Sequence, residues 1–293
     1  MVRLPASAIR RAVRQGLEED LSRGDVTTSV LFGKPVPSSA TTIAQQSLVV
    51  AGMAAAVQTF LAVDASLKLS VLCVDGQQAK NGESLLRIEG DGRSILMAER
   101  VALNFLQHLS GIATLTQQFC RAVCDYPVAI FDTRKTLPGW RAIQKWAVAL
   151  GGGMNHRASL DDGILIKDNH LALLKHRKTA VRKACRLVNA NAPEDLPTIV
   201  EAESLVQVRQ ALAGQADIIL LDNMTPPMVR RAVKLINRRA LVEVSGGVTL
   251  QNVRAMAAAG PDRISIGALT HSAPAAMMSL ELAPITRDRR RRP

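Results

Sequence analysis

The chain has 293 residues, of which 47% are hydrophobic and 21% are charged, and its formal net charge is +12. This balance indicates a globular protein with ample material for a core and excludes a largely disordered chain. Because single hydrophobic cores stop growing near this length, we expect two domains. The longest apolar stretch, near residues 48–63, is interrupted by polar residues and is shorter than the roughly 20 residues that span a bilayer, so we predict no membrane span and no membrane partner.

The positive charge raises the question of whether nucleic acid is a partner. Five arginines crowd the last seven residues, 287–293, where a charge run is usually a solvated tail. Aromatic residues make up only 3% of the chain, which is too few for base stacking. We therefore expect the excess charge to serve small anionic ligands. A basic nucleic-acid-binding protein is the alternative from another functional class, and deletion of residues 287–293 would separate the two.

The first part of the chain predicts an α+β domain. Residues 1–21 alternate arginines with apolar residues at helical spacing, which indicates an amphipathic helix of a cytoplasmic protein and not a secretory signal. Short strands and helices then alternate without a regular unit up to about residue 100. From Arg93 to Cys124 apolar residues recur at helical intervals, with Gly111 as the expected break between two helices. The four cysteines lack metal-binding spacing, and we expect them to be reduced.

The second part of the chain becomes regular, because short apolar runs alternate with helical stretches. Such runs indicate parallel strands that are buried on both faces. Six runs are visible, and a seventh strand is expected near residues 154–157. The six runs are residues 128–131, 163–166, 197–200, 217–221, 241–244 and 263–266.

Polar residues or glycines follow the apolar runs. In a β/α barrel the loops after the strands meet at one face, where the active site lies. The last two turns are glycine-bearing, and late turns of this kind commonly bind phosphate through backbone N–H groups. The residues that we expect at this face are Arg134, Lys135, His156, Arg157, Lys167, Glu201, Asp222, Ser245, Gly246, Gly247 and Gly267.

The chemistry of these residues favours transfer of a ribosyl-phosphate group. A cluster of guanidinium and ammonium groups is costly to bury without anionic ligands, and guanidinium binds carboxylate and phosphate in a bidentate manner. The carboxylates Glu201 and Asp222 are suited to a divalent ion, to sugar hydroxyls or to positive charge in a transition state. Each strand-end residue taken alone is more often a cap or a surface residue, so the argument depends on their meeting in space.

Several long motifs, in the correct order, resemble those of quinolinate phosphoribosyltransferases. The similarity extends from about Glu19 to Ser272. The motifs are Gly-Asp-Val-Thr-Thr at 24–28, Ala-Glu-Arg-Val-Ala-Leu-Asn-Phe at 98–105, Leu-Ser-Gly-Ile-Ala-Thr at 109–114, Asp-Thr-Arg-Lys-Thr-Leu-Pro-Gly at 132–139, Gly-Gly-Gly-Met-Asn-His-Arg at 151–157, Leu-Ile-Lys-Asp-Asn-His at 165–170, Ser-Gly-Gly at 245–247 and Gly-Ala-Leu-Thr-His-Ser at 267–272.

The resemblance implies an α/β fold in which an N-terminal α+β open sandwich precedes an incomplete β/α barrel of six or seven strands. The expected sandwich covers residues 1–112 and is joined by the C-terminal segment 272–293, and the barrel covers residues 113–271. The implied reaction joins quinolinate to phosphoribosyl pyrophosphate and releases carbon dioxide and pyrophosphate, in NAD biosynthesis, with Mg²⁺ as the cofactor. The family also implies a homodimer or higher assembly with shared active sites, in which Arg100 reaches into the neighbouring subunit.

The resemblance also implies a role for each matching residue. Arg134, His156, Arg157 and Lys167 resemble the residues that hold the quinolinate carboxylates, together with Arg100 of the neighbour. Lys135 resembles the pyrophosphate ligand, and Glu201 and Asp222 resemble the pair near the ribose and the magnesium. The turns would hold the 5′-phosphate through Ser245, Gly246, Gly247 and Gly267.

Some positions depart from the family pattern, and rival assignments follow from the same fold. Ser22, Ser159 and Ala202 differ from the usual residues, which concerns loop packing more than chemistry. The choice of Glu201 over Glu203 rests on strand register alone.

The rivals are a ModD-like protein or a nicotinate phosphoribosyltransferase, and a monocarboxylate site would need fewer cations than this sequence offers.

Overall fold

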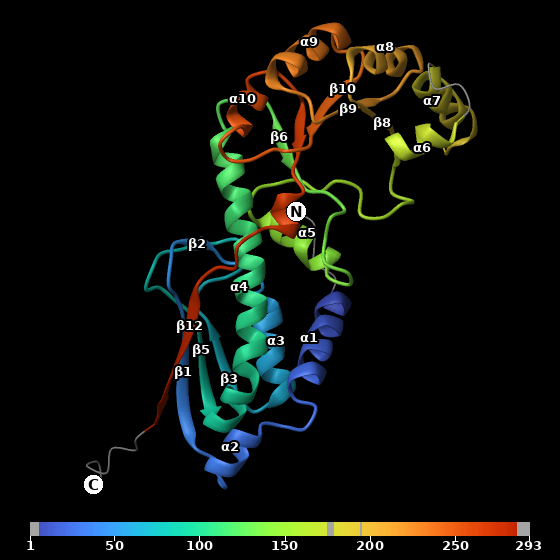
Figure 1. The fold of residues 1–293 in the computed structure, drawn as a ribbon. Coiled ribbons are helices and arrows are strands. Elements are labelled where there is room, and N and C mark those ends of the chain that lie inside the picture. Colours follow the sequence, from blue (N-terminus) through green and yellow to red (C-terminus); the bar gives the residue numbers. More distant parts are fainter. Residues whose placement is uncertain (1–5, 175–178, 194, 286–293) are drawn as a thin grey trace. The chain divides into compact units, whose positions relative to one another are not determined.

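The computed structural model describes residues 6–174, 179–193 and 195–285, and the chain folds into two compact units (Figure 1). Of the described residues, the first unit takes in 6–115, 137–152 and 272–285, and the second takes in 116–136 and those within 153–271. Among the described residues, no helix combines the length and the apolar character needed to span a lipid bilayer.

The first unit contains a four-stranded antiparallel sheet in the order β12-β1-β5-β3. In β1, buried side chains alternate with more exposed ones, as expected for a strand with one face against a core. The last strand, β12, brings the C-terminal part of the chain back to β1. The bounds are β1 Pro37–Ala44, β3 Lys68–Val71, β5 Ser84–Asp91 and β12 Met278–Pro284, with a separate pair formed by β2 Leu48–Val49 and β4 Gln78–Ala79.

Helices of the first unit cover one face of this sheet. Phe60 of α3 and Leu106 of α4 belong to the same buried core as Leu86 and Ile88 of β5. The predicted N-terminal amphipathic helix is confirmed as α1, which buries Ile9 and leaves its arginines exposed. The bounds are α1 Ala6–Asp20, α2 Val26–Leu31, α3 Met53–Val63, α4 Gly92–Ala122 and α5 Arg141–Leu150.

The prediction that Gly111 divides two helices is wrong. Helix α4 is continuous over 31 residues and passes through Gly111. A Cβ atom at this position would overlap the backbone carbonyl of Pro274 and lie 3.2 Å from the Cα of Ala275. Gly111 therefore serves close packing against the returning C-terminal segment, and it does not end the helix.

Helix α5 belongs to the first unit, although the sequence-based boundary placed residues 137–152 in the barrel. Trp140 stacks on Phe105 of α4 with ring centroids 5.0 Å apart. Gln144 is completely buried, and its side-chain nitrogen lies 2.8 Å from Nε2 of His108. These contacts join the segment after the Arg134-Lys135 turn to the helix of the first unit.

The second unit contains a six-stranded parallel sheet in the order β6-β11-β10-β9-β8-β7. All six predicted strands are confirmed. The expected seventh strand is reduced to a single bridge between Phe131 and Met154. The bounds are β6 Ala129–Phe131, β7 Ile164–Ile166, β8 Thr198–Ala202, β9 Ile218–Asp222, β10 Leu241–Ser245 and β11 Arg263–Ser265.

Helices alternate with these strands, which is the arrangement of an incomplete β/α barrel. Local signals set several helix starts: the Ser204 hydroxyl accepts a hydrogen bond from the Gln207 N–H at the start of α8, and α9 begins with two prolines. The bounds are α6 Asp168–Leu173, α7 Ala180–Asn191, α8 Leu205–Ala213, α9 Pro226–Ile236, α10 Val253–Ala257 and α11 Ala268–His271.

The register of the parallel sheet places charged residues in neighbouring rows. Glu201 is the register partner of Leu220, which is also the partner of Glu243. Glu243 is in turn the partner of Arg263. Two residues further along the strands, Asp222 is the register partner of Ser245. Because side chains alternate along a strand, residues of one row point to the same face of the sheet.

Candidate active site

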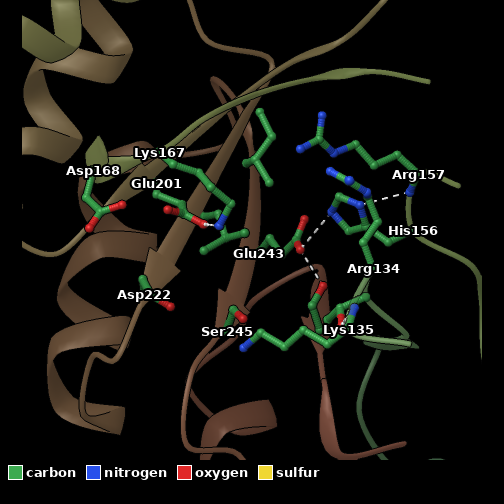
Figure 2. A pocket seen from close by; sticks show the side chains of 14 residues that line it. Arg134, Lys135, His156, Arg157, Lys167, Asp168, Glu201, Asp222, Glu243 and Ser245 are labelled. Atoms are coloured by element: carbon green, nitrogen blue, oxygen red, sulfur yellow. Dashed lines mark hydrogen bonds and ion pairs between the residues drawn. The ribbon is translucent and has the colours of Figure 1, made fainter. Parts of the chain in front are cut away.

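A cavity of about 360 Å³ opens at the C-terminal ends of the parallel strands, and all of its lining residues belong to the second unit. Figure 2 shows Arg134 and Arg157 on one side of it, the Lys167–Glu201 pair across from them, and Glu243 between the two groups. The lining residues are Thr133, Arg134, Lys135, His156, Arg157, Leu165, Lys167, Asp168, Glu201, Leu220, Asp222, Glu243, Ser245 and Ser265.

Two guanidinium groups in this cavity form no salt bridge to a carboxylate of the described residues. Nε of Arg134 is buried and makes no hydrogen bond to the described residues. Arg157 donates from Nη1 to the carbonyl of Gly163 at 2.9 Å. Burial lowers the pKa of the Arg157 guanidinium and the nearby charge of Arg134 lowers it further, whereas the charges of Asp162 and Glu201 act in the opposite direction. Two guanidinium groups held close together at the cost of desolvation indicate a binding site for an anion.

Lys167 and Glu201 form an ion pair across the cavity. The Lys167 side chain is 45% exposed, whereas that of Glu201 is 13% exposed, so the carboxylate is held in the wall and the ammonium can turn. The choice of Glu201 agrees with the structure, because Glu203 is exposed and does not line the cavity. Asp222, one strand along, also lines it.

Lys135 and the glycine turns lie at the other end of the site. The Thr270 hydroxyl donates to the Lys135 carbonyl at 2.7 Å and so fixes the Lys135 turn beside α11. A Cβ atom at Gly267 would lie 2.9 Å from Cδ of Lys135, so only glycine leaves that side chain its path. Gly246 has φ +89° and a Cβ there would overlap the Asn223 side chain, so this turn also needs glycine.

Not all expected site residues line the cavity. Ser245 does, whereas Gly246, Gly247 and Gly267 lie in the flanking turns. Arg100 lies in the first unit, exposed on α4, and is not one of the lining residues. Its expected role in a neighbouring subunit's site stays a prediction.

Sequence reasoning missed three polar residues inside the barrel: Glu243, Arg263 and Ser265. Glu243 is completely buried, accepts a hydrogen bond from the Ser265 hydroxyl and lies 3.1 Å from Nε of Arg263. Oε1 of Glu243, the oxygen that accepts from Ser265, also lies 3.2 Å from Nε2 of His156. The available signal was a charged residue within an apolar run, since Glu243 stands between two valines and Arg263 opens the last strand.

The side chains of the cavity include possible ligands for a metal ion. Among the described residues, no group of three or more histidine, cysteine, aspartate or glutamate side chains is placed to hold one. Two carboxylates, Glu201 and Asp222, do line the cavity. Mg²⁺ usually keeps several waters and binds one or two carboxylates together with substrate phosphates, so this pair fits Mg²⁺ that arrives with a phosphorylated substrate.

Two family descriptions match consecutive parts of the chain. Residues 25–110 match the N-terminal domain of quinolinate phosphoribosyl transferase, and residues 112–281 match its C-terminal domain. A probable nicotinate-nucleotide pyrophosphorylase (carboxylating) from Synechocystis is 40% identical over 273 residues, which cover 92% of this chain and 91% of that protein. The chloroplastic nicotinate-nucleotide pyrophosphorylase (carboxylating) of Oryza sativa is 39% identical over 294 residues, which cover 95% of this chain and 78% of the rice protein.

Solved structures agree with these sequence matches. The nicotinate-nucleotide pyrophosphorylase of Francisella tularensis superposes with a TM-score of 0.88 at 34% identity, covering 96% of this chain and 98% of that one. NadC from Streptococcus pyogenes gives a TM-score of 0.89 at 36% identity, covering 98% of this chain and 100% of that one. With both family domains matched in order and relatives near 40% identity along almost the whole length, this chain belongs to the quinolinate phosphoribosyltransferase family.

Proposed function

We propose that this chain transfers the phosphoribosyl group of phosphoribosyl pyrophosphate to quinolinate and forms nicotinate mononucleotide, pyrophosphate and carbon dioxide, a step of NAD biosynthesis. The observation that carries the proposal is the distribution of charge in the cavity. The guanidinium groups of Arg134 and Arg157, which form no salt bridge to a described carboxylate, and a lysine surround one end, and a second lysine lies beside glycine turns at the other. A small dicarboxylate beside a sugar phosphate satisfies both ends.

The quinolinate carboxylates would be bound by Arg134, Arg157 and Lys167. Guanidinium donates two parallel hydrogen bonds to a carboxylate, which also fixes the orientation of the ring. Lys167 would exchange its Glu201 partner for a substrate carboxylate, which is possible because its side chain is 45% exposed. His156 lies beside Arg157, and Arg100 would reach in from a neighbouring subunit of a homodimer or larger assembly.

Phosphoribosyl pyrophosphate would lie on the side of Lys135. We assign the pyrophosphate to Lys135 and the 5′-phosphate to Ser245, Gly246, Gly247 and Gly267. Glu201 and Asp222 would hold Mg²⁺ and the ribose hydroxyls, and Mg²⁺ would supply neutralisation of the charge on the leaving pyrophosphate.

The reaction then needs positioning and charge stabilisation from the chain. The pyridine nitrogen donates its electron pair to C1 of the ribose while the C1–oxygen bond breaks toward pyrophosphate. Glu201 and Asp222 are placed to stabilise the positive charge that develops on the sugar. The ring carbon next to the nitrogen then loses its carboxylate as carbon dioxide, and the electron pair left on that carbon takes up a proton.

The test is direct turnover with defined substrates. The protein is incubated with quinolinate, phosphoribosyl pyrophosphate and Mg²⁺, and nicotinate mononucleotide and ¹⁴CO₂ from carboxyl-labelled quinolinate are measured. The same assay with nicotinate in place of quinolinate tests the monocarboxylate rival. Equal or better use of nicotinate, or product without release of carbon dioxide, would contradict the proposal.

A further inference from the structure

A polar cluster inside the barrel is formed by Glu243, His156, Ser265 and Arg263, and the proposed chemistry gives no role to Glu243, Ser265 or Arg263. Its central residue, Glu243, lies in the middle of β10 and has no exposed surface. Isolated carboxylates are expensive to bury, so a completely buried one must be held by several partners. We therefore asked what this carboxylate does for the residues around it.

Three partners surround the Glu243 carboxylate. Oε1 accepts a hydrogen bond from the Ser265 hydroxyl and lies 3.2 Å from Nε2 of His156, while Oε2 lies 3.1 Å from Nε of Arg263. Figure 2 shows the Glu243 carboxylate beside the His156 ring, with dashed lines that mark its contacts to the residues drawn. Burial alone would raise the pKa of the Glu243 carboxyl, but His156, Ser265 and Arg263 together lower it, which keeps the group ionised.

The other ring nitrogen of His156 is held by the backbone. The N–H of Arg157 donates to Nδ1 of His156 at 2.9 Å, so Nδ1 is the acceptor nitrogen of the ring. Nε2, which faces a carboxylate oxygen, is then the nitrogen that carries a proton. Both ring nitrogens of His156 are therefore engaged by the protein.

We propose that Glu243 is a positioning residue for the reaction, which faces Nε2 of His156 with its carboxylate, holds the ring in place and through it fixes the backbone at Arg157. The inference rests on the proposed function, because Arg157 is there a ligand of the substrate carboxylate. The backbone N–H of His156 is also held, by Oδ1 of Asp132 at 2.8 Å. The Arg157 guanidinium thus projects from a segment that is anchored at two successive amides.

A corollary concerns the role of His156. Since both ring nitrogens are engaged by the protein, His156 shapes the cavity wall and orients its neighbour. The positive charge that receives the diacid is then that of Arg134, Arg157 and Lys167. This differs from the expectation that His156 holds a carboxylate directly.

The first measurement is made on the unaltered protein. Nitrogen-15 NMR of the ring nitrogens, with the His156 signals assigned by their loss in His156→Asn, should show a proton on Nε2 and none on Nδ1. A proton on Nδ1 would overturn the proposal without affecting the proposed reaction. Absence of turnover by the unaltered protein would instead contradict the proposed reaction and leave the ring assignment standing.

The second measurement is made on Glu243→Gln, with Glu281→Gln on β12 as the exposed control. An amide removes the negative charge that faces the Nε2 proton, so the Nε2 signal of His156 should shift as this contact weakens. The ratio kcat/KM for quinolinate should fall by about 10- to 100-fold, with KM for phosphoribosyl pyrophosphate unchanged. A uniform loss for both substrates, or an unchanged ring spectrum, would contradict the positioning role.

A double variant tests whether Glu243 acts through His156. If it does, Glu243→Gln combined with His156→Asn should lose no more activity than His156→Asn alone, whereas additive losses would overturn the proposal. Ser265→Ala removes one partner of Glu243 and keeps the charge, so it serves if Glu243→Gln does not fold. Ser265→Ala should keep the single Nε2–H tautomer, and loss of that tautomer would contradict the assignment of the holding role to the carboxylate.

Discussion

At the scale of single residues, the cavity contains two arginines that form no salt bridge within the described part of the chain. They are Arg134 and Arg157, whereas Lys167 is paired with Glu201. An enzyme that binds a diacid gains by this arrangement, because the substrate supplies the missing counter-charge and no protein ion pair has to break at the arginines. Removal of these cations should accordingly affect binding of the acid and not the stability of the fold.

Arg134→Ala and Lys167→Ala should each lower kcat/KM for quinolinate by about 100-fold or more, because each removes a charge that pairs with a buried carboxylate of the ligand. Thermal unfolding of both variants should stay close to that of the unaltered protein. Arg209→Ala, an exposed position on α8, is the matched control and should keep full activity. Retained turnover in Arg134→Ala would count heavily against the assigned site.

The four cysteines should differ sharply in reactivity. Burial raises the pKa of the Cys120 and Cys185 thiols to about 11, and burial also raises the pKa of the Cys73 thiol, whereas Cys124 is exposed. Since the thiolate is the reactive form, iodoacetamide at about pH 8 should modify Cys124 first, and mass spectrometry of peptides should show it. Cys124→Ser should then remove the fast phase, and rapid labelling of Cys185 in the folded protein would contradict the assignment.

At the scale of elements, the helix α4 depends on one glycine for its packing. The carbonyl of Pro274 approaches the helix where Gly111 lacks a side chain. This contact belongs to the first unit and leads the chain into β12. The residue type at position 111 is therefore constrained by the backbone of Pro274 and not by the helix itself.

Gly111→Ala should destabilise the protein by about 1–3 kcal/mol, because a methyl group meets backbone that cannot move aside. In an unconstrained helix the same change would stabilise by about 1 kcal/mol. Gly16→Ala in α1 is the comparison, since its Cβ would meet the side chains of Val101, at 3.0 Å, and Phe105, at 3.9 Å, instead of backbone. Urea unfolding should show a lower midpoint for Gly111→Ala alone, and equal midpoints for the two variants would refute the packing argument.

The parallel strands and the helix α4 also show what the sequence could and could not predict. The six parallel strands were found because strands buried on both faces are continuous apolar runs. The single helix α4 was missed, since glycine interrupts helices by propensity but not where tertiary packing requires it. Glu243 and Arg263 were missed because a charged residue inside an apolar run is explained only by the partners that the sheet register brings to it.

At the scale of the whole molecule, the proposed assembly makes a prediction about mixed subunits. Arg100→Ala and Lys167→Ala should each be inactive alone, because each removes one half of a site that two subunits complete. If subunits re-associate at random in a dimer, an equal mixture should recover about a quarter of the original activity. Mass photometry checks the assembly, and absence of recovery after confirmed subunit exchange would contradict the shared site.

The parallel sheet of the second unit ends in β6 and β7, and in the described part of the chain β7 is paired only with β8, through three register positions. Lys167 and Asp168 follow this strand directly. A fully closed barrel has its radius fixed by strand number and stagger. The strand that leads to Lys167 is thus held in the sheet by β8 alone. Substitutions between β7 and β8 can therefore widen or narrow this side of the cavity while the other strands keep their geometry.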